Sequence, residues 1–583
     1  MTAITAAAGA AEPPDWVERS NQHAQVLLDA MARVSPEQAA GLGVEKVDRE
    51  ITDLQPGYRE RAREFTEAAL MELRKRLAAE KDAHVSQDLE IMIDAAELTL
   101  EESRASEKLL VPYFNASRTI FAAMHGLLED RVAPERRAAA LVRLRRYAGM
   151  EDGYEPFTKL AARHTREGLA KGLRPPYRGR VEQQLADSPH MMAGIGPLFE
   201  KYHIEGYQDA LATVKKQVAD YDAFLRDEVL PKASTDFRQP PEIYALSLRR
   251  MGIDIPPEAL ANRARGAFRE IQLQMRELAS LIASKRSLSG SDYRDVIGEL
   301  KRQQLVGEKI LPHYQARLAE IEEIVRREDL VSLPDREARI RLASEAESAA
   351  LPAPHMSPPR LIGNTGQQGE FVLPLRVPDA DGNLRGFDDF TFEAASWTLT
   401  AHEARPGHEM QFASMVETGV SIARAVFAFN STNVEGWALY TESFMKPYMP
   451  LEGQLISLQH RLLRAARAFL DPGLHLGDVT PEEARRVLLE DVMVSEAMAK
   501  QEVDRYMFRM PGQAGSYFHG YQQMIQLRDD LQKAMGPAFK AKAFHDFVLA
   551  QGLLPPGLLR QAVFEQFVEV SRLSLKWKPS VFR

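Results

Sequence analysis

The feature that most constrains this chain is a helical spacing of apolar residues, which recurs in six long stretches before residue 330. Within each stretch, apolar residues lie three and four positions apart among charged ones. The stretches contain little glycine and are rich in Ala, Leu, Glu and Arg, which favour helix. They comprise residues 57–80, 85–110, 136–148, 205–229, 258–286 and 292–327. Strands and helices do not alternate along the sequence, so we expect a mainly α fold without a parallel sheet.

One segment interrupts the helical pattern. Residues 351–369 are rich in proline and glycine and are predicted to be irregular. After them, residues 370–377 and 384–392 have the character of two strands, and an Asp-Gly-Asn string between them favours a tight turn. We therefore expect a β-hairpin. Pro374 lacks a backbone donor, which predicts that the first strand lies at an edge. Helix is expected again from Glu393.

Composition excludes several classes of protein. The net charge is −9, and Lys and Arg are spread along the chain without the basic stripe of a nucleic-acid binder. The absence of cysteine excludes thiolate zinc sites, Fe–S clusters, disulfides and a cysteine nucleophile. Residues 1–16 are predicted to be disordered, and they lack the basic start of a signal peptide. Apolar runs fall short of the roughly 20 residues that cross a bilayer. We expect a cytoplasmic protein with neither nucleic acid nor membrane as partner.

The segment with candidate catalytic residues begins with the adjacent His402 and Glu403. Helices of zinc peptidases often carry H-E-x-x-H, which places two histidines on one face. Here the second histidine, His408, follows after six residues, and an unbroken helix would turn it roughly 240° away from the first. Pro406 and Gly407 favour a break at this point. Such a break would let both histidines meet one metal ion; the alternative is a helix that ends early with two incidental histidines.

A third ligand is expected from a second helix. A catalytic zinc has three protein ligands and one open position for water. Glu435 lies 27 residues after His408, a spacing that two neighbouring helices would give. However, Thr432 and Glu435 also match a helix capping box, so Glu435 is a candidate ligand, a candidate cap, or both. Glu442 lies on the same face and is a candidate to orient a ligating histidine.

These motifs resemble those of the bacterial domain of unknown function 885 family. H-E-x-x-P-G-H at 402–408 is followed by N-x-E-G-W-A-L-Y at 433–440. The same resemblance extends to R-L-L-R-A-A-R at 461–467, D-P-G-L-H at 471–475, P-G-Q-A-G-S-Y at 511–517 and LPKASTDFRQPPEIYALSL in the N-terminal half. It covers roughly residues 15–575. That family is similar to zinc peptidases of the thimet oligopeptidase and thermostable carboxypeptidase type, which implies a large helical zincin-like fold with a deep groove.

The expected site holds one Zn²⁺ bound by His402, His408 and Glu435. Manganese, cobalt or iron would also suit these ligands. Glu403 is then the general base that takes a proton from water and passes it to the leaving amine.

The resemblance also implies a tyrosine near the C-terminus that stabilises the transition state. In the string GSYFHGY, Tyr517 is the first candidate, with Tyr521 and His519 behind it. The alternative is that these aromatic residues one turn apart belong to the core. If the substrate has a free carboxylate, an arginine is expected to bind it. The candidates are Arg528, Arg464 and Arg467, whereas His475 beside a Pro-Gly pair is expected to be structural.

Together these features predict a zinc-dependent hydrolase, a peptidase acting on short peptides or small amides. Two alternatives remain open: hydrolysis of a non-peptide amide or ester, and a non-catalytic helical binding protein. A di-iron bundle needs two E-x-x-H motifs, and Glu200 with His203 supplies one. Residues 17–350 are expected to form one wall of the groove and residues 351–583 the catalytic part, as one intertwined unit.

Overall fold

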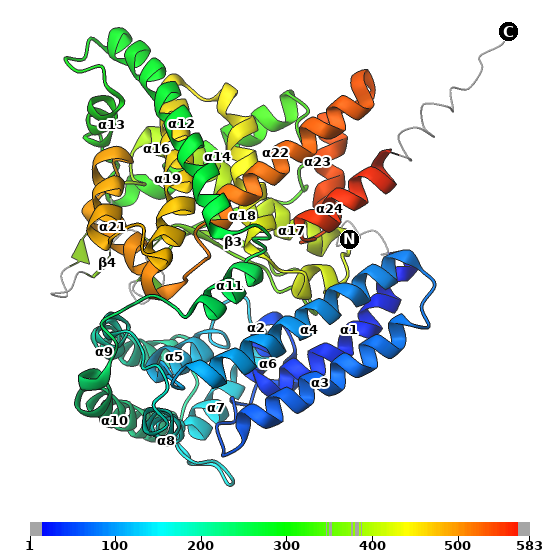
Figure 1. The fold of residues 1–583 in the computed structure, drawn as a ribbon, viewed down its shortest axis with the longest axis vertical. Helices are drawn as coiled ribbons and strands as arrows, with labels where there is room; N and C mark the ends of the chain where they lie inside the picture. Colours follow the sequence, from blue (N-terminus) through cyan, green and yellow to red (C-terminus); the bar gives the residue numbers. More distant parts are fainter. Residues whose placement is uncertain are drawn as a thin grey trace, which may run out of the picture.

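The computed structural model is mainly α-helical, which confirms the predicted fold class (Figure 1). It describes residues 14–344, 347–348, 353–374, 377–378, 384–385 and 388–568. Each stretch with helical periodicity forms helix. These helices are α3 (Tyr58–Leu77), α4 (Ala83–Leu109), α6 (Pro134–Arg137), α7 (Ala139–Tyr147), α10 (Gln208–Phe224), α12 (Pro257–Arg286), α13 (Tyr293–Lys301) and α14 (Ile310–Arg327). Within the described residues, no helix is long and apolar enough to cross a membrane.

The N-terminal helices, blue through cyan to dark green in Figure 1, form two packed groups. In the first, α1 (Asp15–Val34) packs against α3 and α4 around a buried core that includes Leu73 and Leu89. In the second, α5 to α10 surround a separate core. Its further helices are α5 (Ala116–His125), α8 (Phe157–Ala170) and α9 (Arg178–Lys201), and the short α2 (Pro36–Leu42) follows α1. Residues 1–13 lie outside the described residues, and residues 15 and 16 of the segment predicted to be disordered are helical.

The C-terminal helices pack around α19 (Leu451–Leu476), which contacts α12, α16 (Glu393–Glu403) and α22 (Ser516–Met535). One core runs from Tyr244 to Phe518 and takes apolar side chains from both sides of residue 350. This core crosses the predicted boundary at residue 350; the division of the chain into two parts stays a prediction. The remaining helices are α11 (Pro241–Arg250), α17 (His408–Thr418), α18 (Ser431–Met445), α20 (Pro481–Arg486), α21 (Glu496–Asp504), α23 (Ala541–Ala550) and α24 (Pro556–Ala562).

A small sheet lies beside these helices, but its strands differ from the predicted hairpin. β3 (Glu370–Leu373) is the central strand, parallel to β1 (Arg339–Leu342) and antiparallel to β2 (His355–Ser357). The prediction of an edge strand was wrong, because β3 ends one residue before Pro374 and pairs on both sides. β2 also arises inside the segment predicted to be irregular. Part of the predicted hairpin is present as a short antiparallel pair of strands, β4 (Val377–Pro378) and β5 (Leu384–Arg385). The turn between them lies outside the described residues.

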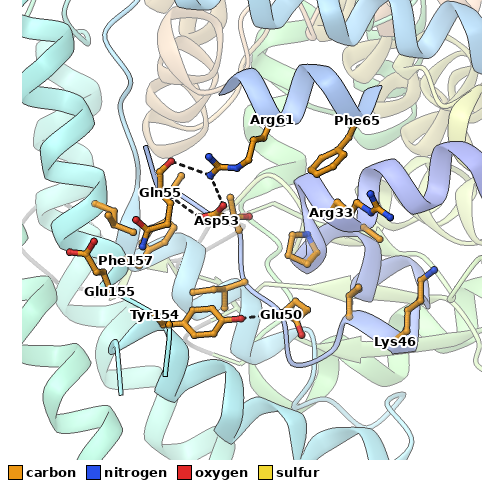
Figure 2. Close-up of a pocket in the computed structure, with 18 of the residues that line it drawn as sticks. Arg33, Lys46, Glu50, Asp53, Gln55, Arg61, Phe65, Tyr154, Glu155 and Phe157 are labelled. Atoms are coloured by element: carbon orange, nitrogen blue, oxygen red, sulfur yellow. Dashed lines mark hydrogen bonds and ion pairs between the residues drawn. The ribbon is translucent and has the colours of Figure 1, made fainter. Parts of the chain in front are cut away.

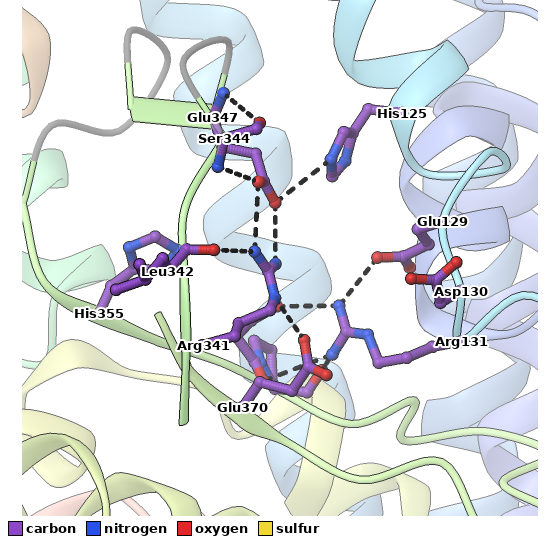
Figure 3. Close-up of polar contacts among 12 residues, drawn as sticks. His125, Glu129, Asp130, Arg131, Arg341, Leu342, Ser344, Glu347, His355 and Glu370 are labelled. Carbon is purple, nitrogen blue, oxygen red and sulfur yellow. Dashed lines mark hydrogen bonds and ion pairs between the residues drawn. The ribbon is translucent and has the colours of Figure 1, made fainter. Parts of the chain in front are cut away.

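Charged side chains tie this sheet to the N-terminal helices (Figure 3). Arg341 on β1 binds Glu370 on β3 at 2.8 Å and Glu347 at 2.8 Å, and Glu347 lies 3.6 Å from His125 at the end of α5. Arg131 follows α5, and its guanidinium donates to the carbonyl of Pro358 at 2.7 Å and to the hydroxyl of Ser357 at 2.8 Å. Strand β2 is thereby held from the N-terminal half of the chain.

Candidate metal centre

The predicted break between the two histidines is present. Helix α16 ends at Glu403, and α17 begins at His408 after a four-residue turn. The peptide bond before Pro406 is cis. A side chain on Gly407 would overlap the carbonyl oxygen of His402, so the chain can close this tightly only with glycine. The indole of Trp437 donates to the carbonyl of Pro406 at 3.0 Å and holds the turn in place.

The turn brings both imidazoles to one carboxylate. Glu435 on α18 places Oε2 at 3.3 Å from His408 Nε2 and 3.5 Å from His402 Nε2. Two ligands of a tetrahedral zinc ion with bonds near 2.0–2.1 Å lie roughly 3.3 Å apart. Glu435 Oε2 is buried and has no hydrogen-bond donor among the described residues. The spacing, the donor types and this unpartnered oxygen fit a metal ion with two histidine ligands and one carboxylate ligand.

The capping alternative for Glu435 is wrong. Helix α18 is capped by Asn430, whose side chain accepts from the backbone N–H of Asn433. The hydroxyl of Thr432 instead donates to the carbonyl of Met251 at 2.8 Å. The carboxylate of Glu435 is therefore free to face the histidines.

Glu442 lies behind the ligands, as its position on the helix predicted. Its Oε1 accepts from His402 Nδ1 at 2.7 Å, and its Oε2 accepts from Thr398 Oγ1 at 2.6 Å. This bond places the ring proton on Nδ1 and leaves Nε2 free as a ligand. Burial alone would raise the pKa of Glu442, but Arg464 and His402 outweigh it and lower the pKa to about 2. The carboxylate is therefore ionised at neutral pH and can orient His402.

The field of these carboxylates favours positive charge at the cluster. Burial alone would lower the pKa of His402, but the nearby carboxylates of Glu435 and Glu442 raise it to about 9. Burial would also raise the pKa of Glu435, and the two histidines hold it well below its ordinary value. The surroundings of the cluster thus favour a positive charge.

A cavity of about 570 Å³ opens onto this cluster. Glu403 lines it, and its Oε1 lies 4.0 Å from His402 Nε2. Tyr517 lines it as well, with its ring 6.4 Å from that of His402 and nearly parallel to it. The Tyr517 hydroxyl accepts from Arg505 Nη2 at 3.1 Å. The base and the tyrosine predicted from the sequence therefore lie on the same cavity as the candidate ligands.

Other predicted residues lie away from this cavity. The imidazole of His519 is bonded to Asp254 at 2.8 Å, and Arg528 is paired with Asp529 at 2.7 Å. The hydroxyl of Tyr521 lies 3.2 Å from that of Ser443. None of the three lines the cavity in the described part of the chain. For these residues the geometry favours a structural role over substrate contact.

Of the other residues predicted from the sequence, some line the cavity and some do not. Arg464 and Arg467 both line the cavity, and Arg467 is held by Glu502 through two bonds of 2.6 and 2.8 Å. His475 is structural, since its Nε2 lies 2.9 Å from the carbonyl of Tyr506. The di-iron alternative finds no support in the geometry, because His203 lies beyond the end of α9 and does not line the cavity.

Sequence reasoning missed several residues of the cavity. They are Arg118, His355, Met356, His460, Arg505 and Arg509. Arg505 and Arg509 lie one turn apart just before the 511–517 motif, so helical spacing beside a motif could have suggested them. Arg118 on α5 and the β2 residues reach the cavity from remote parts of the chain, which local patterns do not reveal.

A second cavity, of about 730 Å³, lies among the N-terminal helices (Figure 2). Two pairs of its charged groups bind each other: Lys46 pairs with Asp29, and Arg61 pairs with Asp53 at 2.5 Å. It is the larger of the two, but convergent polar groups mark a functional site better than size does. The cavity with the histidine cluster is therefore the stronger candidate.

Comparison with known proteins matches one family, and the similar solved structures include two putative lipoproteins. The family described as "Bacterial protein of unknown function (DUF885)" matches residues 36–563. A putative lipoprotein of unknown function from Shewanella oneidensis has 18% identity and a TM-score of 0.73, with 95% of this chain and 100% of that one covered. A putative lipoprotein from Colwellia psychrerythraea has 19% identity and a TM-score of 0.74, with 94% and 99% covered. No protein with a curated description matches. At these identities the two structures show a shared fold.

Proposed function

The chain belongs to the bacterial DUF885 family, as its motifs predicted, and from the geometry of its histidine cluster we propose that it is a zinc-dependent hydrolase of peptide bonds. The observation that carries this proposal is the convergence of His402, His408 and Glu435, whose ligand atoms lie within 4.8 Å of one another, with Glu403 beside them on an open cavity. Three ligands and an adjacent carboxylate are what metal-assisted amide hydrolysis requires.

Each group has a role that follows from its position. Zn²⁺ bound by these three ligands would lower the pKa of water and polarise the scissile carbonyl. Glu403 takes a proton from the attacking water while the oxygen of that water forms a bond to the carbonyl carbon. It returns that proton to the nitrogen when the C–N bond breaks, so that an acid and an amine leave. The Tyr517 hydroxyl donates to the carbonyl oxygen as negative charge develops on it. Glu442 is a positioning residue that fixes the ring of His402.

Elemental analysis tests the metal site. We expect about one zinc per chain in the wild type after zinc is supplied, and its loss in His408→Ala. His519→Ala is the matched control, because His519 is also buried but lies outside the cavity. A wild type that binds no zinc under these conditions would show that the proposal is wrong.

Peptide cleavage tests the chemistry separately. Glu403→Gln should retain zinc, because Glu403 is not among the ligands, and should lose activity by at least roughly 100-fold. The assay follows new amino groups released from a mixture of short peptides. Equal activity in wild type and Glu403→Gln would exclude Glu403 as the base.

A further inference from the structure

The cavity beside the metal cluster carries an excess of arginine. Five arginines line it against four carboxylates. Four of these arginines, which we call the arginine wall, are Arg118, Arg464, Arg505 and Arg509. Arg118 comes from α5, Arg464 from α19, and the other two from the helical turn at Arg505–Arg509. A wall with this charge attracts anions.

The four carboxylates are already engaged. Glu403 and Glu435 belong to the metal cluster. Asp389 binds Lys301 at 2.7 Å and accepts from the backbone of Ser495 at 2.9 Å. Glu502 binds Arg467 through both of its oxygens, and one of them lies 3.4 Å from Arg505. The cavity therefore does not neutralise its own arginines.

Several hydrogen-bond donors of the arginine wall lack acceptors. The Nε atoms of Arg464 and Arg505 are buried and lack acceptors among the described residues. Among the described residues, Arg118 and Arg509 form neither an ion pair nor a side-chain hydrogen bond. Their charges lie near each other and near the carboxylate of Asp187, and Arg118 is exposed. Buried donors without acceptors are costly, and an anion bound at Arg464 and Arg505 would relieve this cost.

The arginine wall also lies close to the reacting bond. Arg505 donates to the hydroxyl of Tyr517, whose ring faces that of His402. Arg464 Nη2 lies 3.7 Å from Glu442, which holds the other side of the same imidazole. One side chain thus separates each of these arginines from a candidate metal ligand. An anion bound here would be part of a residue next to the bond that is cleaved.

We propose that the arginine wall binds a carboxylate of the substrate, so that the preferred substrates are peptides with a carboxylate beside the scissile bond. This inference rests on the proposed hydrolase function and names its substrate class. Guanidinium groups match a carboxylate bidentately, which gives both affinity and orientation. The carboxylate is either the C-terminus of the peptide or the side chain of an acidic residue; the chemistry of recognition is the same.

Four peptides of one sequence separate the two sources. They end in a free acid or an amide and carry Gln or Glu at the residue after the cleaved bond. A charge-assisted bond to arginine is worth roughly 10- to 100-fold in kcat/KM. If the free acid is favoured by this factor, the C-terminus is recognised; if Glu is favoured among the amides, the side chain is recognised. Equal cleavage of all four would overturn the proposal.

Arg509→Gln then tests the arginine wall itself. Arg509 has no side-chain partner among the described residues, so its loss should leave the packing intact. We expect the preference for the carboxylate to fall at least 5-fold, mainly through a higher KM, because the bond is made to the ground state and to the transition state alike. Arg302→Gln is the control, since Arg302 is 76% exposed and lies outside the cavity. An unchanged preference in Arg509→Gln would contradict the assignment.

Calorimetry separates this proposal from the hydrolase function. Zinc-loaded Glu403→Gln is titrated with the Gln peptide as free acid, with the Glu peptide as amide and with the neutral Gln amide, so that binding is measured without turnover. At least one of the two acidic peptides should bind at least 10-fold more tightly than the neutral amide, and Arg509→Gln in the same background should remove the difference. If no peptide is cleaved by the wild type but the acid still binds preferentially, the hydrolase proposal fails and the arginine wall stands. If neither acidic peptide binds more tightly than the neutral amide, the arginine wall proposal fails, whether or not peptides are cleaved.

Discussion

Arg467 and Glu502 form a buried ion pair beside Tyr517, and this pair decides which arginines remain available to a ligand. The guanidinium of Arg467 lies 4.6 Å from the Tyr517 ring centroid and is bound by both oxygens of Glu502. A buried pair of this kind contributes little against an apolar alternative, but removal of one partner leaves an isolated charge and is strongly destabilising. Arg467 is therefore expected to support the cavity rather than bind substrate.

This pair predicts an acid limit to stability. Burial alone would raise the pKa of Glu502, but Arg467 and Arg505 lower it from 4.5 to about 2. The unfolded chain therefore binds more protons between these two pH values, and the stability that the pair supplies is lost as pH falls from about 4.5 to 2. In Glu502→Gln we expect the free energy of unfolding to drop by about 3–5 kcal/mol at pH 7, with a smaller difference from wild type at pH 3.

Urea unfolding between pH 7 and pH 3 measures both effects. Glu496→Gln is the control, because Glu496 forms an exposed pair with Arg485 and its loss should cost less than about 1 kcal/mol. A difference between wild type and Glu502→Gln that stays constant over this pH range would mean that Glu502 is not ionised by its arginines.

At the residue scale, the sequence was informative where the chemistry is local. His402, Glu403 and His408 lie within seven residues, and the Pro-Gly pair between the histidines predicts the turn that joins them. Glu435 was accessible from helix spacing, although its capping alternative needed the position of Asn430 to be excluded. Most of the arginine wall could not be predicted from the sequence, because an arginine on α5 reaches the cavity only through the packing of whole helices.

At the scale of elements, the crossing of α18 and α22 positions Glu435 and Tyr517 relative to each other. Gly436 and Gly520 face each other at this crossing, and a Cβ on Gly436 would lie 2.6 Å from the carbonyl carbon of Gly520. A Cβ on Gly520 would overlap the carbonyl oxygen of Thr432. The two helices touch along their backbones, which glycine alone permits.

Gly520→Ala should therefore force the two helices apart. We expect a loss of about 1–3 kcal/mol in stability from overpacking, and at least a 10-fold fall in peptide cleavage because Tyr517 moves with α22. Thermal denaturation and the peptide assay measure these effects. Gly266→Ala on α12 is the matched control: a Cβ there meets nothing within 4 Å, so this change should be neutral or stabilising. Wild-type stability and activity in Gly520→Ala would show that the crossing tolerates a side chain.

The helices could be predicted from the sequence and the sheet only in part, because helices depend on neighbouring residues and strand pairing depends on distant ones. The period of an amphipathic helix is visible in consecutive residues of the sequence. Helix α12 (Pro257–Arg286) therefore matches the predicted range 258–286 closely. Strand β2 has three residues, and its backbone partners lie on β3, more than ten residues further along. Pairing of this kind is set by tertiary contacts, so composition alone indicated an irregular segment.

At the scale of the whole molecule, the metal cavity depends on contacts between distant parts of the chain. His355 and Met356 on β2 line the cavity, and β2 is an edge strand of its sheet. Arg131 holds the end of this strand from the N-terminal helices, through the carbonyl of Pro358 and the hydroxyl of Ser357 (Figure 3). This wall of the cavity is thus fastened by a residue more than 200 positions earlier.

Arg131→Ala should loosen that wall without disturbing the metal cluster. Arg131 contacts none of the three candidate ligands among the described residues, so we expect unchanged zinc content and a KM for peptides that rises several-fold while kcat changes little. Faster hydrogen exchange of residues 353–374 should accompany the change in KM, because the backbone at Ser357 and Pro358 loses its donors. Arg145→Ala is the control: Arg145 lies on the nearby α7, and its side chain pairs with Glu151 at 2.5 Å. If both variants change exchange and KM equally, the effect belongs to the N-terminal helices in general; if Arg131→Ala alone does so, the N-terminal half of the chain shapes the cavity through β2.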